Sequence, residues 1–477
     1  MRIHDTFFFG ALFFLVGVLA RNIGIRKEIL IFTIIVGLIF GILFLFTRSK
    51  KALALTALVL LTIPGAVFYT SYELNFQKNQ NIEFNKEITF IGRVRNNPLQ
   101  KTFQESILEL QEPYKGSVQI RTPNYPIFKH GEILTFIGEV QKTKGGYGDY
   151  LERNKKVAGI SYFPKLQKRK EATNSISKTL FTLREKILSA FKQTLPYTES
   201  AFLGGITIGS REEFTDEFKD AMSKSGTTHL VALSGYNITI LVKVTATILA
   251  LVLSRKKALF GTIIAIIGFV AMTGAEASVV RAAIMGILAS IAPFVGRIYA
   301  PRNSIILAAL LMALWNPNIL AHDVGFQLSF LALIGIVYLK PAIEKLFRIK
   351  NAGLLAWKEN LTTTASAQIM VTPLLITTFG SVSAASLISN LLILELIPFT
   401  MFLGFILAAV HLISYNLSLI IAWITLIPLK VELGIIKLFS IITIPISTNL
   451  TAITITIYYL FLAGIIYRLT KFKPIQT

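Results

Sequence analysis

The stretch HLVALSGYNITILVK (residues 229–243) reads as the first half of a membrane span, yet it carries several groups that hydrogen-bond or ionise. Lys243 falls near the middle of the 229–254 span, where a charge costs at least about 2.5 kcal/mol unless it meets a partner or water. We therefore expect the stretch to line a hydrated pathway; the alternative is a polar helix interface in which Lys243 pairs with Glu276 or Glu395. The candidate pathway-lining residues here are His229, Ser234, Gly235, Tyr236, Asn237 and Lys243.

Polar side chains recur in the later apolar segments. On a helix, Ser278 and Arg281 share one face, and Glu276 stands near the expected helix start. Each polar residue taken alone could be a packing residue or a cap, but together they supply mostly neutral hydrogen-bonding groups with isolated charges. That mixture suits a hydrated pathway better than a tight small-ion site. The further pathway candidates are Glu276, Arg281, Asp323, Gln327, Ser329, Gln368 and Asn390.

The residue types argue against catalysis. None of the five histidines forms a close-spaced ligand set such as HExxH, and Cys is absent, so we expect no metal site and no cofactor. Ser234 stands in ALSG, close to the G-x-S-G of intramembrane serine proteases, and His322 is the one plausible base for it, although a lone Ser-Gly in a span is usually packing. The chain has no G-x-x-x-x-G-K-[ST], which excludes ATP hydrolysis by that motif. The sequence thus favours a channel or transporter without catalytic residues.

Composition places these residues in a polytopic α-helical membrane protein. The chain is 53% hydrophobic and 16% charged, with a mean hydropathy of +0.62, whereas soluble domains carry about 25% charged residues. Uncharged runs such as 29–46, 52–72, 258–275 and 282–296 are long enough to span a bilayer, which takes roughly 20 residues. We expect about ten to twelve membrane segments. Three of them should occupy 1–72, with an uncleaved first helix at the N-terminus, and the others should lie in a membrane domain at 229–477.

Residues 73–170 have a different pattern, that of a soluble β domain. ITFIGRVRN (88–96), SILELQE (106–112), GSVQIRT (116–122) and GEILTFIGEVQK (131–142) alternate apolar and polar residues, with turn signals between them, one of them GGYG at 145–148. Short strands at this spacing suggest an OB-like barrel. The net charge of +22 includes a cluster of Lys and Arg after 141, which fits either anionic lipid headgroups or a phosphate-binding surface. On a phosphate-binding surface, the candidate contacts would be Arg93, Arg95, Lys142 and Lys144.

Two amphipathic helices are expected in the linker 171–228. Residues 176–195 carry one apolar stripe with Lys and Arg mostly elsewhere, which is typical of a helix lying in the membrane interface. In 210–226, Ser210 and Glu213 form a possible capping box and Gly226 can end the helix. Both helices could also simply pack under the membrane domain.

The motifs in this order resemble the ComEC-type competence proteins, which are inner-membrane channels for single-stranded DNA in natural transformation. The resemblance rests on GGYGDYLERNKKVAGI (145–160), GGITIGSREEF…SKSGTTHLVALSG (204–235), TGAEASVVRAAIMG (273–286) and NPNIL…DVGFQLSFLALIG (316–335), and continues through 373–390. It implies single-stranded DNA and the bilayer as partners, an extracytoplasmic OB-like domain at 73–170, and a location in the plasma or inner membrane. With no nucleotide site in this chain, it also implies a separate DNA receptor and a cytoplasmic translocase.

The sequence departs from the family pattern in three places. The family usually reads Ser-Gly-Leu-His where this chain has Tyr236 and Asn237 after Ser-Gly, and Glu395 replaces an expected Pro. Many members continue into a metallo-β-lactamase-like nuclease domain, whereas this sequence stops at Thr477, so we expect a separate nuclease. The competing hypothesis is a transporter that uses the same scaffold for another substrate.

Overall fold

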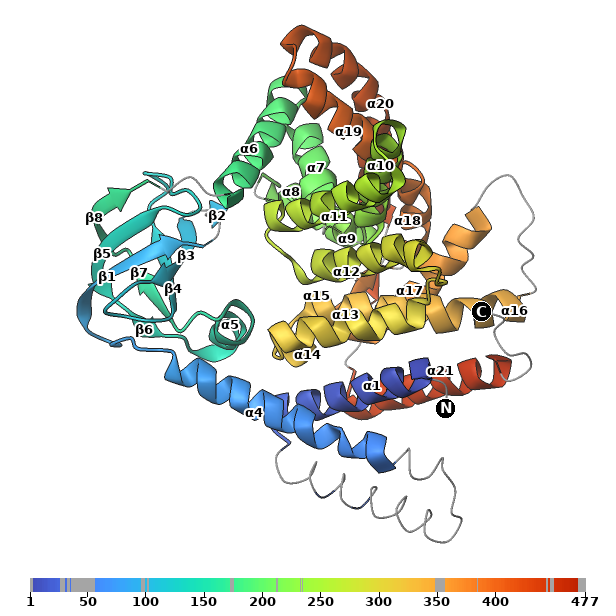
Figure 1. Cartoon of the computed structure of the whole chain (residues 1–477). Coiled ribbons are helices and arrows are strands. Elements are labelled where there is room, and N and C mark those ends of the chain that lie inside the picture. Colours follow the sequence, from blue (N-terminus) through green and yellow to red (C-terminus); the bar gives the residue numbers. More distant parts are fainter. Residues whose placement is uncertain are drawn as a thin grey trace. The chain divides into compact units, whose positions relative to one another are not determined.

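The computed structural model describes residues 3–25, 31, 35, 56–95, 99–100, 103–171, 176–211, 213–231, 233, 235–347, 357–383, 385–442, 445–446 and 450–470 (Figure 1). The chain divides into two compact units. The first, which we call the β unit, comprises Met1–Phe181 and Arg302–Val324. The second, the helical unit, comprises Thr182–Pro301 and Gly325–Thr477. The second expected span, 29–46, lies outside the described residues, except that residues 31 and 35 are described as α-helical.

In the β unit, helices α1 (Ile3–Asn22) and α4 (Thr62–Lys78) cross in close contact. A Cβ on Gly17 would lie 2.0 Å from the carbonyl oxygen of Thr62, and a Cβ on Gly65 would lie 2.1 Å from that of Phe14. The two backbones therefore touch because both helices present glycine at the crossing, as small residues do in membrane helix pairs. Helices α13 (Pro301–Trp315) and α14 (Ile319–His322) belong to the same part of the fold. Guanidinium Nη1 of Arg302 on α13 lies 3.3 Å from Asp5 Oδ1 on α1.

The soluble domain within the β unit is an eight-stranded sheet in the order β6-β7-β4-β3-β1-β5-β8, with β2 paired to β3. The long strands are β1 (Glu87–Val94), β3 (Gln104–Leu110), β4 (Ser117–Thr122), β5 (Ile133–Glu139) and β8 (Lys165–Lys170), and the short ones are β2 (Leu99–Gln100), β6 (Gln141–Lys142) and β7 (Gly159–Tyr162). Neighbouring strands are antiparallel except for β4 and β7. Phe90, Leu108, Ile120, Leu134 and Phe136 fill the core on one face.

The four predicted strand segments are confirmed, and two features of the β domain differ from expectation. GGYG does not form a turn, because Gly145–Tyr150 is helix α5, which continues as a π-helix over Leu151–Lys155. Leu151 in the π-helix and Val157 just after it pack against Ile160 on the second face of the sheet. The paired strands form an open sheet, since the described pairings do not join β6 or β7 to β8, rather than a closed OB-like barrel. Helix α4 runs six residues past the expected boundary at 72, to Lys78.

The helical unit begins with α6 (Ile176–Thr194), most of which belongs to it, α7 (Tyr197–Ile208), α8 (Asp216–Ser225) and the short α9 (Thr228–Val231). Gly226, at φ +71°, ends α8 as predicted. The predicted capping box is wrong, because the N-cap of α8 is Thr215, whose Oγ1 accepts a 3.2 Å hydrogen bond from the backbone N–H of Phe218. Ser210 instead follows the C-cap of α7, Gly209.

Longer helices make up the rest of the helical unit. They are α10 (Gly235–Val252), α11 (Arg255–Met272), α12 (Ala277–Ile291), α15 (Val324–Ile334), α16 (Lys340–Leu346), α17 (Trp357–Phe379), α18 (Ser386–Leu394), α19 (Ile397–His411), α20 (Tyr415–Ile442) and α21 (Ala452–Thr470). A 3₁₀ turn (Ala292–Val295) extends α12, a π-helix (Gly335–Leu339) joins α15 to α16, and β9 (Val382–Ser383) pairs with β10 (Pro445–Ile446).

Six helical segments of the described chain are long and apolar enough to cross a membrane, or seven if the bent pair α18–α19, with a 48° angle at its break, forms one span. The six are Asp5–Asn22, Thr56–Lys78, Ala277–Val295, Val324–Leu346, Tyr415–Ile442 and Ala452–Leu469. The protein is thus a multi-pass helical membrane protein, as its composition predicts.

Candidate functional site

The segment 197–237 is the centre of the helical unit. Helix α7 is buried from Ser200 to Ile208 and packs against α19 and α20. Gly404 allows α19 to approach, since a Cβ there would lie 2.8 Å from Leu203 Cδ1, and Gly205 allows α9 to approach, since a Cβ there would lie 3.0 Å from Val231 Cγ1. This segment therefore fixes the position of the residues that follow it, where α10 begins.

Two of the polar motifs singled out in the sequence meet at the start of α10. Ser278 Oγ on α12 donates a 2.7 Å hydrogen bond to the carbonyl oxygen of Leu233. A Cβ on Gly235 would lie 3.4 Å from Arg281 Nη2, an ordinary van der Waals distance, so the guanidinium lies beside the start of α10. Asn237 Nδ2 donates a 2.8 Å hydrogen bond to the carbonyl oxygen of Ile206 on α7. We call these five residues, Leu233, Gly235, Asn237, Ser278 and Arg281, the polar junction.

Arg281 brings a buried positive charge to the polar junction. Its exposed fraction is 7%, and its guanidinium lies 5.8 Å from the ring centroid of Phe330 on α15. Among the described residues no carboxylate pairs with it. The nearby acid Glu276, the N-cap of α12, is bound instead by Arg211, with Nη2 3.3 Å from Glu276 Oε2. A guanidinium held in this way can attract an anionic group through charge-assisted hydrogen bonds that are stronger at low dielectric.

A second contact joins the same central segment to α18. Ser389 Oγ donates a 2.7 Å hydrogen bond to the carbonyl oxygen of Ser225, and a Cβ on Gly226 would lie only 2.3 Å from Ser386 Cβ. Asn390, a predicted pathway residue, is buried on this helix, and its Oδ1 has no hydrogen-bond partner within the described chain. An amide oxygen in that state is a potential acceptor for water or another donor.

Other predicted pathway residues are not drawn into the polar junction. Lys243 is exposed rather than buried, and its expected partners are occupied elsewhere, Glu276 by Arg211 and Glu395 by Asn360 Nδ2. The pairing of Lys243 with one of these acids, which was the alternative to a hydrated pathway, is not found among the described residues. His229 is exposed, while Gln327 and Ser329 on α15 and Gln368 on α17 are partly buried. Asp323 belongs to the β unit, between α14 and α15. Ser234 and the side chain of Tyr236 lie outside the described residues.

The predicted DNA contacts in the β unit separate into two groups. Arg93 and Arg95 are exposed at and beyond the end of β1, whereas Lys142 and Lys144 are exposed at and just after β6, and three strands separate β6 from β1 in the sheet order. The sequence did not single out the aromatic residues near β4 and β7. The Arg121 guanidinium lies 5.4 Å from the ring centroid of Tyr162, and the rings of Phe103 and Phe163 lie 5.0 Å apart edge to face. We call Phe103, Arg121, Tyr162 and Phe163 the aromatic platform; its three rings are exposed.

Sequence reasoning also missed a buried hydrogen-bond network in the β unit. Tyr69 OH on α4 donates to Asn22 Oδ1 (3.1 Å) or to Asn318 Oδ1 (3.0 Å), and Asn22 Nδ2 donates to the carbonyl oxygen of Pro317 (3.1 Å). His322, considered from sequence only as a base for Ser234, lies in this network, with Nε2 3.0 Å from Asn22 Oδ1. The repeated Asn of NPN (316–318) was the available signal, because amides are costly to bury unless they are paired. In the helical unit, buried Glu432 likewise went unnoticed; Thr400 Oγ1 donates to its Oε1 at 2.7 Å.

Comparisons with known proteins place this chain among competence proteins. Residues 206–472 match the family model described as "Competence protein". Over 330 residues the chain is 28% identical to ComE operon protein 3 of Bacillus subtilis (strain 168), a match that covers 66% of this chain and 41% of that protein. The chain therefore corresponds to less than half the length of this curated relative. No solved structure matches it. Because the family match takes in the polar junction and more than half of the sequence, the chain belongs to the competence protein family.

Proposed function

We propose that this protein is a membrane channel that admits single-stranded DNA during natural transformation. The observation that carries the proposal is the polar junction, where amide, hydroxyl and backbone groups meet a buried guanidinium among apolar helices. A DNA strand carries one phosphate per nucleotide and bases with polar edges. Arg281 would attract successive phosphates, while Asn237 and Asn390 would exchange hydrogen bonds with bases or water without holding any of them firmly.

The β unit would gather the strand outside the membrane. Its sheet would act in the manner of an OB-like domain, since single strands are bound by exposed aromatic rings on which bases stack and by cations that contact phosphates. The aromatic platform offers three exposed rings and Arg121. Arg93, Arg95, Lys142 and Lys144, all exposed, would add attraction for the backbone phosphates.

Strand entry requires partners in this proposal. The sequence has no phosphate-binding loop for ATP, so the driving force would come from a cytoplasmic translocase, and a DNA receptor and a nuclease would act before the channel. The 73–170 domain would lie on the extracytoplasmic side of the plasma or inner membrane.

The test is cytoplasmic entry of fluorescently labelled duplex in the source organism after deletion of the gene and complementation. We expect Arg281→Gln to reduce entry at least about tenfold, Arg281→Lys to retain part of it, and Lys256→Gln to match the wild type, because a lost charge-assisted contact is worth about 1.5–3 kcal/mol. Lys256 is an exposed cation on α11, so this control removes the same charge away from the polar junction. Undiminished entry in the deletion strain, with no second copy of the gene, would refute the proposal and favour a transporter of another substrate.

A further inference from the structure

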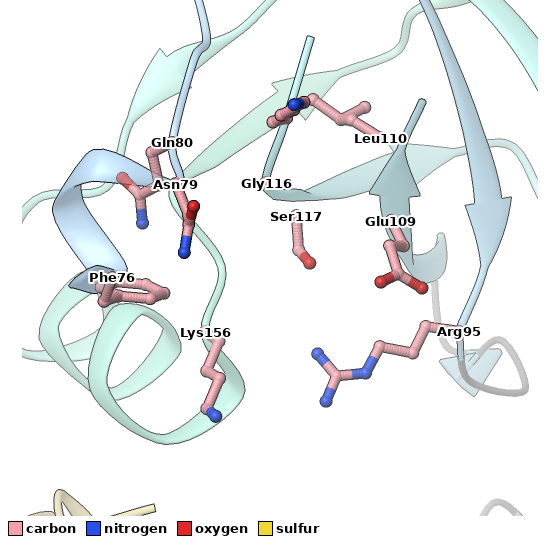
Figure 2. Close-up of a pocket in the computed structure, with 10 residues that line it drawn as sticks. Phe76, Asn79, Gln80, Arg95, Glu109, Leu110, Gly116, Ser117 and Lys156 are labelled. Atoms are coloured by element: carbon pink, nitrogen blue, oxygen red, sulfur yellow. The ribbon is translucent and has the colours of Figure 1, made fainter. Parts of the chain in front are cut away.

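A pocket of about 500 Å³ opens in the β unit where α4 ends against the sheet. Figure 2 shows Phe76 and Asn79 from the end of α4 on one side of it, with Lys156, and Arg95 and Glu109 from the sheet on the opposite side. Its size falls within the roughly 300–1,000 Å³ of small-molecule sites. The pocket has an aromatic ring, amides and ionised groups around one opening, which is the composition of a binding site for a small anion with an apolar portion.

The charges around this pocket are unbalanced. Arg95, Lys115 and Lys156 line it together with one acid, Glu109, and within the described residues none of the four forms an ion pair. Lys156 is partly buried, and its Nζ lies 5.3 Å from the ring centroid of Tyr72. Burial, and then the neighbouring Arg95, lower the pKa of the Lys156 ammonium. A cation in this situation gains by meeting an anion, since opposite charge favours its ionised form.

The pocket adjoins the end of a candidate membrane span. Helix α4 ends the candidate span Thr56–Lys78, and Tyr72 near its end is a residue of the kind that sits at the membrane–water interface. At 1.5 Å per residue, Phe76 lies about 6 Å beyond Tyr72 along the axis. The headgroup layer on each side of the hydrocarbon core is about 5–8 Å thick. In a bilayer whose hydrocarbon core ends at Tyr72, Arg95, across the pocket from Phe76, and Lys156, on the same side as Phe76, would lie at the depth of lipid phosphates.

We propose that this pocket binds the headgroup phosphate of an anionic phospholipid, with Arg95 and Lys156 contacting the phosphate and Phe76 packing on the glycerol and first methylenes. Basic pockets beside membrane helices are suited to such headgroups. A DNA strand fits the pocket less well, because binding of a single strand uses several successive stacking rings, whereas among the described residues Phe76 alone lines this pocket with a ring. The three exposed rings of the aromatic platform lie on other elements. The lipid site thus shares Arg95 with the proposed DNA-gathering surface, and the experiment separates the two roles.

The experiment measures lipid retention by the full-length protein. The protein is reconstituted in nanodiscs of phosphatidylcholine with one quarter phosphatidylglycerol, released into mild detergent, and examined by native mass spectrometry. We expect the wild type to retain phosphatidylglycerol in preference to phosphatidylcholine. We expect Arg95→Gln/Lys156→Gln to lose at least about tenfold in retained phosphatidylglycerol, since each basic group near an anionic surface contributes roughly fivefold. Lys115→Gln, an exposed single change, should cause a smaller loss in the same direction.

The matched control is Lys165→Gln/Lys168→Gln, which removes the same charge from two exposed positions on the edge strand β8. It should retain the lipid like the wild type; equal losses in the two double variants would overturn the proposal in favour of diffuse attraction. Gel filtration and thermal unfolding of each variant exclude a folding defect as the cause. A labelled thymidine 20-mer is then titrated in the same detergent. Unchanged lipid retention by the pocket variant together with weakened oligonucleotide binding would make the pocket a nucleic-acid site and would also overturn the proposal.

Discussion

Nη1 of Arg153 lies 2.8 Å from Nε2 of His322 in the β unit. A guanidinium can only donate, so the ring nitrogen accepts, and His322 is neutral with its proton on Nδ1. The same Nε2 lies 3.0 Å from Asn22 Oδ1, an atom that can only accept. Nε2 therefore accepts a hydrogen bond from Arg153 when the ring is neutral, and donates one to Asn22 Oδ1 when the ring is protonated. Protonation would exchange a bond to the π-helix for a bond to α1.

This exchange predicts that mild acid loosens the π-helix. Burial, and then Arg153, lower the pKa of His322, while Asp149 acts in the opposite direction. Because the folded-state pKa lies below the ordinary value of about 6.5, the bond to Arg153 is fully present above that pH and is lost as the pH falls through the folded-state pKa. Amide hydrogen exchange over 151–158, corrected for intrinsic rates, should accelerate as the pH is lowered below about 6.5. In His322→Gln, which cannot titrate, that acceleration should disappear; its persistence would assign the effect to another group.

Ser278→Ala should destabilise the polar junction measurably. It removes the hydroxyl that donates to the Leu233 carbonyl oxygen at 2.7 Å and leaves that oxygen without this partner, a loss of about 1–2 kcal/mol. Thermal unfolding of the detergent-solubilised protein reports the change. Ser290→Ala on the same helix is the control, because Ser290 Oγ bonds only the Gly286 carbonyl one turn earlier, which local geometry already satisfies. Equal effects of the two substitutions would mean that the contact between α12 and Leu233 adds no stability.

Gly226→Ala should be much more damaging than Gly274→Ala. Both glycines have positive φ, +71° and +84°, so an added Cβ costs roughly 1–2 kcal/mol of backbone strain at either position. At Gly226 the new methyl group would also lie 2.3 Å from Ser386 Cβ, whereas at Gly274 nothing lies within 4 Å. We therefore expect reduced folded yield and a lower unfolding temperature for Gly226→Ala beyond those of Gly274→Ala. Comparable losses would show that α18 moves freely away from Gly226.

The aromatic platform can be tested by its affinity for single strands. Tyr162→Ala and Phe163→Ala each remove one exposed ring, and a stacked base is worth about 1–3 kcal/mol, so binding of a labelled oligonucleotide by the full-length protein should weaken roughly 5- to 100-fold. Tyr125→Ala is the matched control, because Tyr125 is 81% exposed and contacts no other ring or cation in the described chain. Equal weakening by the control, or none in the platform variants, would remove the platform from the proposed function.

The local sequence pattern predicted which strands and helices form better than it predicted which other residues they contact. The alternation in 88–142 gave four strand segments correctly, because each strand buries apolar side chains of one face in the core, although β4 is buried on both faces. The edge strand β8 was missed, since all six of its residues are exposed and no alternation marks it. Ser210 and Glu213 have the spacing of a capping box, but Gly209 has already ended α7 just before them, and Glu213 forms an ion pair with Lys192 on α6. Spacing alone does not reveal such a competing partner.

For the same reason, only part of the candidate site could be predicted from the sequence. Helical periodicity placed Ser278 and Arg281 on one face, and both do contact the 233–235 segment. Periodicity does not say which helix covers a face, so the exposure of Lys243 and the pairing of Glu276 with Arg211 could not be derived. The amide network around Asn22 joins residues 249 to 300 positions apart, a separation at which one sequence gives no pattern.

The β unit is built from two separate stretches of the chain, which affects the order in which it assembles in the cell. Asn22 and Tyr69 reach their partners Pro317 and Asn318 across 295 and 249 residues, and those partners belong to the stretch 302–324. At about 5–20 residues per second, the ribosome needs roughly 12–50 s to make the intervening 249 residues. During that interval α1 and α4 would carry unsatisfied polar groups in the nascent chain. The two helices can therefore complete these hydrogen bonds only after residues 302–324 have been made. Chains truncated before residue 324 should be recognised and degraded as incomplete.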